Sequence, residues 1–390
     1  MTDNKNKKRV AILGSTGSIG SQTLEVVERY SDLFEVVTLT ANKSWEKLVV
    51  QAIKFMPDSV VIADKSYYKN VCDALSDTYI KVYAGSESVE QIVENSDIDV
   101  VVSALVGFSG LFPTANALRH GKKVALANKE SLVVAGEIVM GLSQKYNAPI
   151  IPVDSEHSAI FQSLVGEYSP IEKIILTASG GPLRTWSQSE IENASVNDVL
   201  AHPNWVMGQK ITVDSATMMN KGFEVIEAKW LFDLKPEQID VTIHPSSVVH
   251  SMVQFCDGAV KAQLGTPDMK LPIQYALTFP ERLEMDIENR LDFSKIMNLS
   301  FSPPDKIRFP LLEVAYEAMR KGGNMPCIVN SANEVAVAAF LEGKINFGSI
   351  FRIIENCILT INYLSSPSLD DYLLCDREVR KYAAEIVKKL

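Results

Sequence analysis

The feature that most constrains this chain is an alternation of strand-like and helix-like segments between residues 9 and 153. Short apolar runs alternate with longer segments whose apolar residues recur at helical spacing. Such alternation is typical of a parallel sheet with helices on both faces. We therefore predict a Rossmann-like, doubly wound α/β domain. Its predicted strands are 9–14, 35–40, 58–64, 99–105, 122–128 and 148–154, and its clearest helices are 18–30, 44–56 and 130–146.

The rest of the chain has a different pattern. Strands such as 172–179 and 259–265 are mixed with Ser, Gly, Pro and His clusters, which predicts a central α+β catalytic domain with long loops. The residues from 310 onward predict a small C-terminal helical bundle. With 390 residues, two or three domains are expected. The predicted divisions are 1–154 (nucleotide-binding domain), 155–279 (catalytic domain, with a flexible loop at about 199–209), 280–308 (linker) and 309–390 (helical bundle).

Composition excludes several classes of protein. No apolar run approaches the roughly 20 residues that a membrane-spanning helix needs, so no membrane partner is expected. A net charge of −10 argues against a nucleic-acid partner, although it leaves room for a small phosphorylated ligand. The five cysteines lack CxxC spacing and predict reduced thiols. The basic residues 1–9 lack the apolar stretch of a signal peptide, so we expect a cytoplasmic location.

A glycine-rich turn follows the first predicted strand. Gly14, Gly17 and Gly20 have GxxGxxG spacing and lead directly into a predicted helix. Glycines let the backbone approach a pyrophosphate, and the helix N-terminus supplies amide donors. In this strand–turn–helix context the pattern predicts dinucleotide binding; the alternative is a tight turn without a ligand.

The end of the second predicted strand indicates which dinucleotide binds. NAD enzymes usually place a carboxylate there for the ribose 2′-hydroxyl. This chain has Asn42, Lys43 and Ser44 instead, and Lys43 can pair with a 2′-phosphate. NADPH is therefore favoured over NADH. The alternative is that Lys43 is an ordinary surface lysine.

Acidic residues follow a later strand and recur on a helix. In an extended conformation Asp154 and Glu156 point to one face, where paired carboxylates can bind a hard divalent cation. Helical spacing places Asn220, Glu224 and Glu227 on one stripe, and Glu224 could complete the site. Ligands of this type imply Mg²⁺ or Mn²⁺, with Co²⁺ as a further candidate. The alternatives are a solvated acidic turn and an exposed helix face.

Other residues with chemical potential lie near these acids in the sequence. Asn128, Lys129 and Glu130 end one strand and start a helix, which alone is equally consistent with an ordinary helix start. Four of the five histidines lie in the middle third of the chain, which favours a site there. Trp205 and Met207 could cover a bound ligand, or simply pack within their loop. The four histidines are His157, His202, His244 and His250.

Blocks spread through most of the chain resemble the 1-deoxy-D-xylulose 5-phosphate reductoisomerase family. The block from His202 to Ala228 is the most specific. The matching segments are GSTGSIG (14–20), ALANKESLV (125–133), PVDSEHSAIFQ (152–162), TASGGP (177–182), HPNWVMGQKITVDSATMMNKGFEVIEA (202–228), HPSSVVHSMV (244–253), PDMKLPIQYA (267–276) and NSANE (330–334).

The resemblance implies a role for each matching residue. It implies a metal held by Asp154, Glu156 and Glu224, and catalytic roles for these ligands with Lys129, His157 and His202. The implied NADPH contacts are Gly14, Thr16, Gly17, Ser18, Ile19, Asn42, Lys43, Ser44, Asn128, Glu130 and Gly208. The implied substrate contacts are Lys129, Ser155, Glu156, Ser179, His202, Trp205, Ser215, Asn220, Lys221, Glu224 and His250, with Ser179, Ser215, Asn220 and Lys221 around the substrate phosphate.

The resemblance also implies a reaction: metal-dependent rearrangement of a sugar phosphate, by a retro-aldol/aldol route or an alkyl shift, then reduction by NADPH. The product would be 2-C-methyl-D-erythritol 4-phosphate, an isoprenoid precursor, and a homodimer is expected.

Departures from the family pattern are small: Asn42-Lys43-Ser44 stands where Gly-Lys-Asn is expected, and Leu183 where Phe is expected. The competing functions are an NADP-dependent semialdehyde or polyol dehydrogenase and a nucleotide sensor without catalysis. No cysteine has the context that a semialdehyde dehydrogenase requires.

Overall fold

The computed structural model describes residues 7–202, 205, 207–285, 290–296 and 298–390, and the chain divides into two compact units. The predicted flexible loop 199–209 and the predicted linker 280–308 lie partly outside the described residues. The first unit comprises Met1–Ser131, Val139–Ser158 and Met269–Asp286, and the second comprises Leu132–Ile138, Ala159–Asp268 and Ile287–Leu390.

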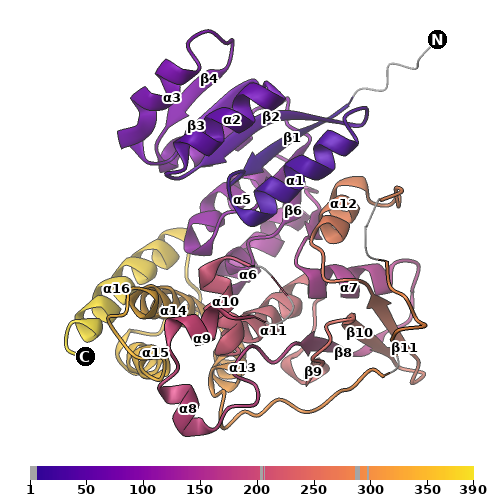
Figure 1. Ribbon diagram of the computed structural model, residues 1–390, viewed down its shortest axis with the longest axis vertical. Coiled ribbons are helices and arrows are strands. Elements are labelled where there is room, and N and C mark those ends of the chain that lie inside the picture. Colours follow the sequence, from indigo (N-terminus) through magenta and orange to yellow (C-terminus); the bar gives the residue numbers. More distant parts are fainter. Residues whose placement is uncertain (1–6, 203–204, 206, 286–289, 297) are drawn as a thin grey trace. The chain divides into compact units, whose positions relative to one another are not determined.

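A seven-stranded sheet forms the centre of the first unit (Figure 1). Its order is β4–β3–β2–β1–β5–β6–β7, and all neighbouring strands run parallel. This confirms the predicted doubly wound α/β fold. The strands are β1 (Lys8–Leu13), β2 (Phe34–Ala41), β3 (Ser59–Ile62), β4 (Lys81–Ala84), β5 (Val100–Ser103), β6 (Lys123–Leu126) and β7 (Ile150–Pro152).

The central strands are mostly apolar because helices cover both faces of a parallel sheet. Every residue of β3 and β5 is buried. The helices that carry residues of this unit are α1 (Ser18–Arg29), α2 (Trp45–Phe55), α3 (Tyr68–Ala74), α4 (Ser86–Gln91), α5 (Leu111–Arg119), α6 (Glu130–Lys145), the start of α7 (Ser155–Leu164) and α12 (Lys270–Thr278). Short 3₁₀ turns lie at Lys65–Tyr67, Ile92–Glu94 and Gly107–Gly110.

The strand order reverses at β1, which pairs with β2 on one side and β5 on the other. In open parallel sheets, ligands bind beyond the carboxyl ends of the strands at this position. The glycine-rich turn follows β1 directly, so the fold places it at the expected binding edge.

Two local predictions differ from the structure. The edge strand β4, Lys81–Ala84, was not among the predicted strands. The prediction of an extended chain through Asp154 and Glu156 is wrong, because α7 begins at Ser155 and places Glu156 in its first turn. The same-face argument for these two carboxylates therefore does not hold.

The second unit contains a four-stranded mixed sheet in the order β11–β10–β8–β9. Strand β10 is antiparallel to β8 and β11, whereas β8 and β9 are parallel. The strands are β8 (Ile171–Ala178), β9 (Ile239–Ile243), β10 (Val249–Phe255) and β11 (Val260–Leu264), and the nearby helices are α8 (Gln188–Glu192), α9 (Val196–Leu200), α10 (Gln209–Ala216) and α11 (Met219–Leu231), with a 3₁₀ turn at Pro236–Gln238.

Four helices follow near the C-terminus: α13 (Leu311–Lys321), α14 (Met325–Leu341), α15 (Ser349–Thr360) and α16 (Leu369–Val387). α14 is buried along most of its length and packs against the other three. This confirms that the residues after 310 are helical. The domain limits derived from the sequence stay predictions. No helix in the described part of the chain has both the length and the apolarity to cross a membrane.

Candidate active site

The glycine-rich turn between β1 and α1 is closely packed against its surroundings. Gly14 has a φ of +82°, and a Cβ there would lie 2.7 Å from the Ala104 carbonyl oxygen. A Cβ at Gly20 would lie 2.3 Å from the Gly14 carbonyl oxygen. A side chain at either position would therefore displace backbone, so the tight turn requires glycine.

The N-terminus of α1 suits a phosphate group. Gly17 is the N-cap residue, no side chain caps the helix, and its first turn contains no acidic residue. The first amides and the positive end of the helix dipole are thus not neutralised by the protein's own side chains. This geometry fits the pyrophosphate of a dinucleotide.

The predicted cofactor residues at the end of β2 form an exposed turn. Asn42, Lys43 and Ser44 are all exposed, and Ser44 is the N-cap residue of α2. Their exposure leaves them accessible to a ligand at the carboxyl edge of the sheet.

The side chain of Asn128 forms hydrogen bonds to the loop that follows β5. Its Nδ2 donates to the carbonyl oxygens of Leu105 at 2.9 Å and Gly107 at 3.0 Å. Its Oδ1 accepts from the Ser131 backbone nitrogen at 3.1 Å, and its Nδ2 lies 3.1 Å from Glu130 Oε2. The buried amide therefore holds neighbouring backbone in place, a role that the sequence did not suggest.

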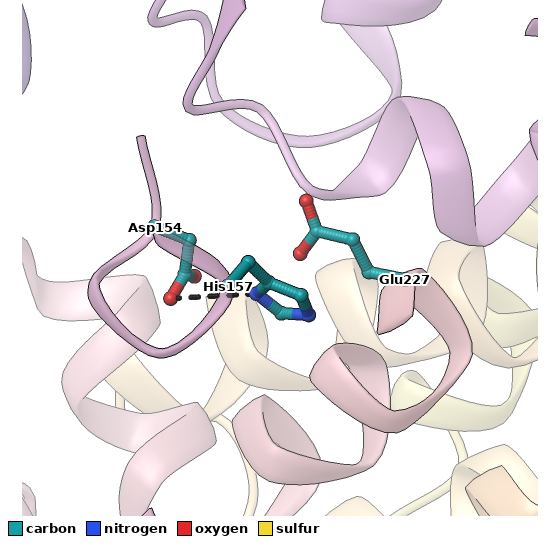
Figure 2. A group of neighbouring side chains, drawn as sticks. All are labelled: Asp154, His157 and Glu227. Atoms are coloured by element: carbon teal, nitrogen blue, oxygen red, sulfur yellow. Dashed lines mark ion pairs between the residues drawn. The ribbon is translucent and has the colours of Figure 1, made fainter. Parts of the chain in front are cut away.

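Asp154 lies in a buried cluster of charged groups at the end of β7. The ammonium of Lys129 is 2.6 Å from its carboxylate, and both side chains are at most 10% exposed. His157 Nδ1 lies 3.7 Å from Asp154 Oδ1, the contact marked in Figure 2. Burial would raise the pKa of Asp154, but Lys129 and His157 outweigh it and hold that pKa well below its ordinary value. The carboxylate is therefore ionised.

The first turn of α7 carries the second predicted metal ligand. The Ser155 hydroxyl donates to Glu156 Oε2 at 2.5 Å, and the Glu156 backbone nitrogen donates to Asp154 Oδ1 at 3.3 Å. Asp154 thus interacts with the backbone of the first helical turn as an N-terminal acid does. This interaction explains why the chain turns into a helix here.

In the second unit, α11 carries the third predicted metal ligand with two predicted substrate residues. Asn220 Nδ2 donates to Glu224 Oε1 at 2.5 Å, and Lys221 forms an ion pair with Glu224. Lys221 and Glu224 are both buried, at 4% and 1% side-chain exposure. The predicted helical stripe is confirmed for Asn220 and Glu224, and Lys221, one turn away, compensates the carboxylate.

The Ser-Gly-Gly turn after β8 packs against the end of α10. Gly181 has a φ of +71°, and a Cβ there would lie 2.7 Å from the Ser215 carbonyl oxygen. The Gly181 backbone nitrogen donates to Ser179 Oγ at 3.2 Å. Two segments predicted to contact the substrate phosphate, at Ser179 and Ser215, are therefore adjacent.

His202 has a defined hydrogen-bonding arrangement in the same unit. The Trp205 backbone nitrogen donates to His202 Nδ1 at 3.1 Å, which leaves Nε2 as the protonated nitrogen of a neutral ring. Nε2 lies 3.1 Å from Ser179 Oγ. Burial lowers the pKa of His202. His202 is thus a neutral donor next to Ser179.

His250, on β10, is buried. Burial lowers its pKa to about 4. The ring centroids of Trp205 and His250 are 6.3 Å apart. His202, Trp205 and His250 therefore belong to one cluster. His244 hydrogen-bonds to the Ser300 carbonyl oxygen and Ser246.

Three family models match successive parts of the chain. The model for 1-deoxy-D-xylulose 5-phosphate reductoisomerase matches residues 10–136, and two models for C-terminal domains of this enzyme match 150–232 and 264–382. The enzyme of that name from Bacteroides fragilis is 57% identical over 384 residues, covering 98% of this chain and 99% of the relative. The chain belongs to the 1-deoxy-D-xylulose 5-phosphate reductoisomerase family.

Solved structures of the family agree along the whole chain. The reductoisomerase from Zymomonas mobilis in complex with NADPH has a TM-score of 0.90 and 40% identity, covering 99% of this chain and all of that one. A reductoisomerase in complex with NADPH, fosmidomycin and magnesium has a TM-score of 0.93 and 40% identity, covering 98% of each chain. Family membership confirms the resemblance seen in the sequence.

The structure groups the predicted reductoisomerase residues within each unit. In the first unit, Asp154 lies next to both Lys129 and His157. In the second, Ser179 contacts His202, and Glu224 contacts its neighbours on α11. The roles of all these residues stay predictions.

Sequence reasoning missed several residues that hold these groups in place. Lys47 and Gln51 on α2 bind the glycine-rich turn. Arg308 donates to the carbonyl oxygens of Arg184 at 3.0 Å and Trp186 at 2.6 Å, beyond the Ser-Gly-Gly turn. The helical spacing of Lys47 and Gln51 was a usable signal, but no local pattern marks a contact that spans more than 100 residues.

Proposed function

We propose that this protein converts 1-deoxy-D-xylulose 5-phosphate to 2-C-methyl-D-erythritol 4-phosphate, with NADPH as reductant and a divalent cation as cofactor. The reaction supplies an isoprenoid precursor by the non-mevalonate pathway. The observation that carries the proposal is the 57% identity to named reductoisomerases over nearly the full length of both chains. The bound ligands of solved family members support the two cofactors.

The proposed metal ligands are Asp154, Glu156 and Glu224. Their donor atoms are all carboxylate oxygens, which suit Mg²⁺ or Mn²⁺, and Co²⁺ as a further candidate. Asp154 and Glu224 each form an ion pair with a lysine, Lys129 and Lys221 respectively, and the lowered pKa of Asp154 keeps that carboxylate in the ionised form that metal binding needs. When bound, a divalent cation would stabilise negative charge on the substrate's oxygens.

The proposed NADPH site follows the binding edge of the first unit. The bare N-terminus of α1 suits the pyrophosphate, so the backbone at Thr16, Gly17, Ser18 and Ile19 would hold it. Asn42, Lys43 and Ser44 would surround the adenosine 2′-phosphate. Further contacts are proposed for Gly14, Asn128, Glu130 and Gly208. When bound, NADPH supplies the hydride for the reduction.

The proposed substrate site uses polar side chains of the second unit for the phosphate. Ser179, Ser215, Asn220 and Lys221 combine hydroxyl and amide donors with one buried ammonium, a suitable set for a phosphate monoester. His202 would donate from Nε2, and Trp205 and His250 would exclude water. Binding energy from the phosphate would help to close residues 199–209 over the substrate.

Lys129 is the proposed proton carrier. Its Nζ lies 2.6 Å from Asp154, and an ammonium held there could deliver a proton to the substrate oxygens. Ser155 and Glu156 would orient the same end of the substrate, and His157 would keep Asp154 in position. We also propose that the protein is cytoplasmic and acts as a homodimer, as expected for this family.

The test is the loss of NADPH absorbance by purified protein with 1-deoxy-D-xylulose 5-phosphate and Mg²⁺ or Mn²⁺. We expect oxidation that stops with chelator, is restored by added cation and is weak with NADH. Product analysis should find 2-C-methyl-D-erythritol 4-phosphate. Protein that binds NADPH but does not oxidise it with this substrate would refute the proposed function.

A further inference from the structure

Helix α2 contacts the glycine-rich turn through two side chains one helical turn apart, Lys47 and Gln51. The Gln51 amide makes two hydrogen bonds to Ser15: Nε2 donates to the carbonyl oxygen at 2.9 Å, and Oε1 accepts from the hydroxyl at 2.8 Å. Lys47 Nζ donates to the Thr16 carbonyl oxygen at 2.8 Å and to Ser21 Oγ at 2.9 Å. The helix thus holds the turn at successive residues.

The two contacts differ in kind. Gln51 is buried, and its neutral amide is matched to a neutral partner. Lys47 is exposed and places a full positive charge against a carbonyl and a hydroxyl, both neutral. Hydrogen bonds between two ionised groups are stronger than those to neutral acceptors. An anionic group at this turn would therefore be a better partner for Lys47 than the ones it has.

The charged residues beside the end of β2 indicate that a 2′-phosphate bound there would need a second cation besides Lys43. The Asp64 backbone nitrogen donates to the Asn42 carbonyl oxygen at 3.1 Å, so Asp64 lies next to the predicted 2′-phosphate residues. Hydrogen bonds from Ser66 lower the pKa of Asp64 most, and the charge of Lys43 lowers it further. A phosphate monoester carries about −1.5 to −2 charges at neutral pH. Lys43 offers one ammonium group, so it cannot balance that charge alone.

We propose that Lys47 is a specificity-determining residue that binds the adenosine 2′-phosphate of NADPH together with Lys43. The inference rests on the proposed function, since it concerns the cofactor of that reaction. Lys47 lies three residues after Ser44 on α2, and its Nζ already reaches the glycine-rich turn. When NADPH binds, the ammonium exchanges the Thr16 carbonyl for the phosphate. NADH offers no such group and leaves Lys47 on the turn.

The test compares the dissociation constants of NADPH and NADH, measured by calorimetric titration without substrate. Lys47→Met should weaken NADPH binding about 10- to 100-fold, the loss expected for one charge-assisted contact, and should weaken NADH binding clearly less, because NADH loses only the support of the turn. Lys47→Arg, which keeps the charge, should retain most of the preference. The salt dependence of NADPH binding should also decrease in Lys47→Met.

Lys54→Met is the matched control. Lys54 is on the same helix and pairs with Glu28 at 2.7 Å, so its removal changes the net charge equally without a contact to the turn. It should leave both dissociation constants unchanged.

Equal losses for NADPH and NADH in Lys47→Met would show a merely structural role and overturn the inference, as would no loss for either. Lys47→Gln keeps a donor for the turn and serves as the second variant if Lys47→Met is unstable. Wild-type protein that does not bind NADPH would instead contradict the proposed function.

Discussion

Replacing Asn333 by Asp should make the stability of the second unit depend on pH. Asn333 lies on α14 and Asp214 on α10, and both side chains are fully or almost fully buried. Asn333 Nδ2 donates to Asp214 Oδ1 at 2.8 Å, and Lys210 Nζ is 2.9 Å from Asp214 Oδ2. Asn333→Asp keeps the shape of the side chain but brings a second carboxylate against the first.

The magnitude follows from two contributions. Loss of a hydrogen bond to a charged group costs about 1.5–3 kcal/mol. Two like charges 4 Å apart repel by about 4 kcal/mol at an effective dielectric constant of 20. Because Lys210 offsets part of the repulsion, we expect Asn333→Asp to lower the free energy of unfolding by about 3–5 kcal/mol at pH 8.

The sign of the pH dependence follows from proton binding. Repulsion raises the folded-state pKa of the carboxylate pair above the unfolded value of about 4. Between these pKa values the folded variant binds more protons than the unfolded chain, so its free energy of unfolding falls as pH rises. The variant should therefore recover about 1–3 kcal/mol between pH 8 and pH 5.5 relative to wild type, at 1.36 kcal/mol per pKa unit.

The assay is urea unfolding followed by tryptophan fluorescence at both pH values. Three of the four tryptophans, at 186, 205 and 230, belong to the second unit, so the signal reports mainly on the mutated region. Asn333→Ala is the matched control, which loses the hydrogen bond without adding charge and should lose about 2 kcal/mol at either pH. An equal loss for both variants at both pH values would refute the reasoning.

Four further outcomes follow from the structure. Gln51→Ala removes both hydrogen bonds to the glycine-rich turn and should weaken NADPH and NADH binding together, by about tenfold in titrations; a changed ratio would contradict its positioning role. Glu224→Gln should abolish most turnover but retain NADPH binding, and retained turnover would count against the proposed metal site. Gly181→Ala forces a Cβ to 2.7 Å from the Ser215 carbonyl oxygen at a φ of +71°, so we expect a loss of about 1–3 kcal/mol in thermal unfolding and a raised KM for the sugar phosphate. The pKa of His250 is lowered to about 4, so the free energy of unfolding of the wild type should fall as pH drops from about 6.5 towards 4. His250→Gln should flatten that pH dependence, and an unchanged slope would exclude His250 as its source.

Local sequence patterns determined much of this protein. The alternation of apolar runs and amphipathic segments predicted a parallel sheet, and the glycine spacing after β1 predicted the tight turn at its binding edge. These inferences succeed because strand and helix periodicities, and the steric freedom of glycine, act over a few residues. The helical stripe with Asn220 and Glu224 could be read from the sequence for the same reason.

A local pattern failed where a tertiary neighbour or a backbone interaction decided the outcome. The chain after Asp154 looked extended from its sequence, but the Glu156 backbone nitrogen donates to Asp154, and a helix begins at Ser155. The sequence also gave no sign that Lys129 would neutralise Asp154. The first fact is a local N-terminal interaction that the extended interpretation overlooked, whereas the second depends on which groups share a buried space.

Only the tertiary structure decided how distant segments support the candidate site. Gln51 binds Ser15 across 36 residues, and Asn333 binds Asp214 across 119. A sequence records which polar groups exist, whereas burial requires each of them to find a partner that packing brings within about 3 Å. Local periodicity therefore determined the elements and the chemistry they carry, and the packing of the buried polar groups determined how that chemistry is held in place.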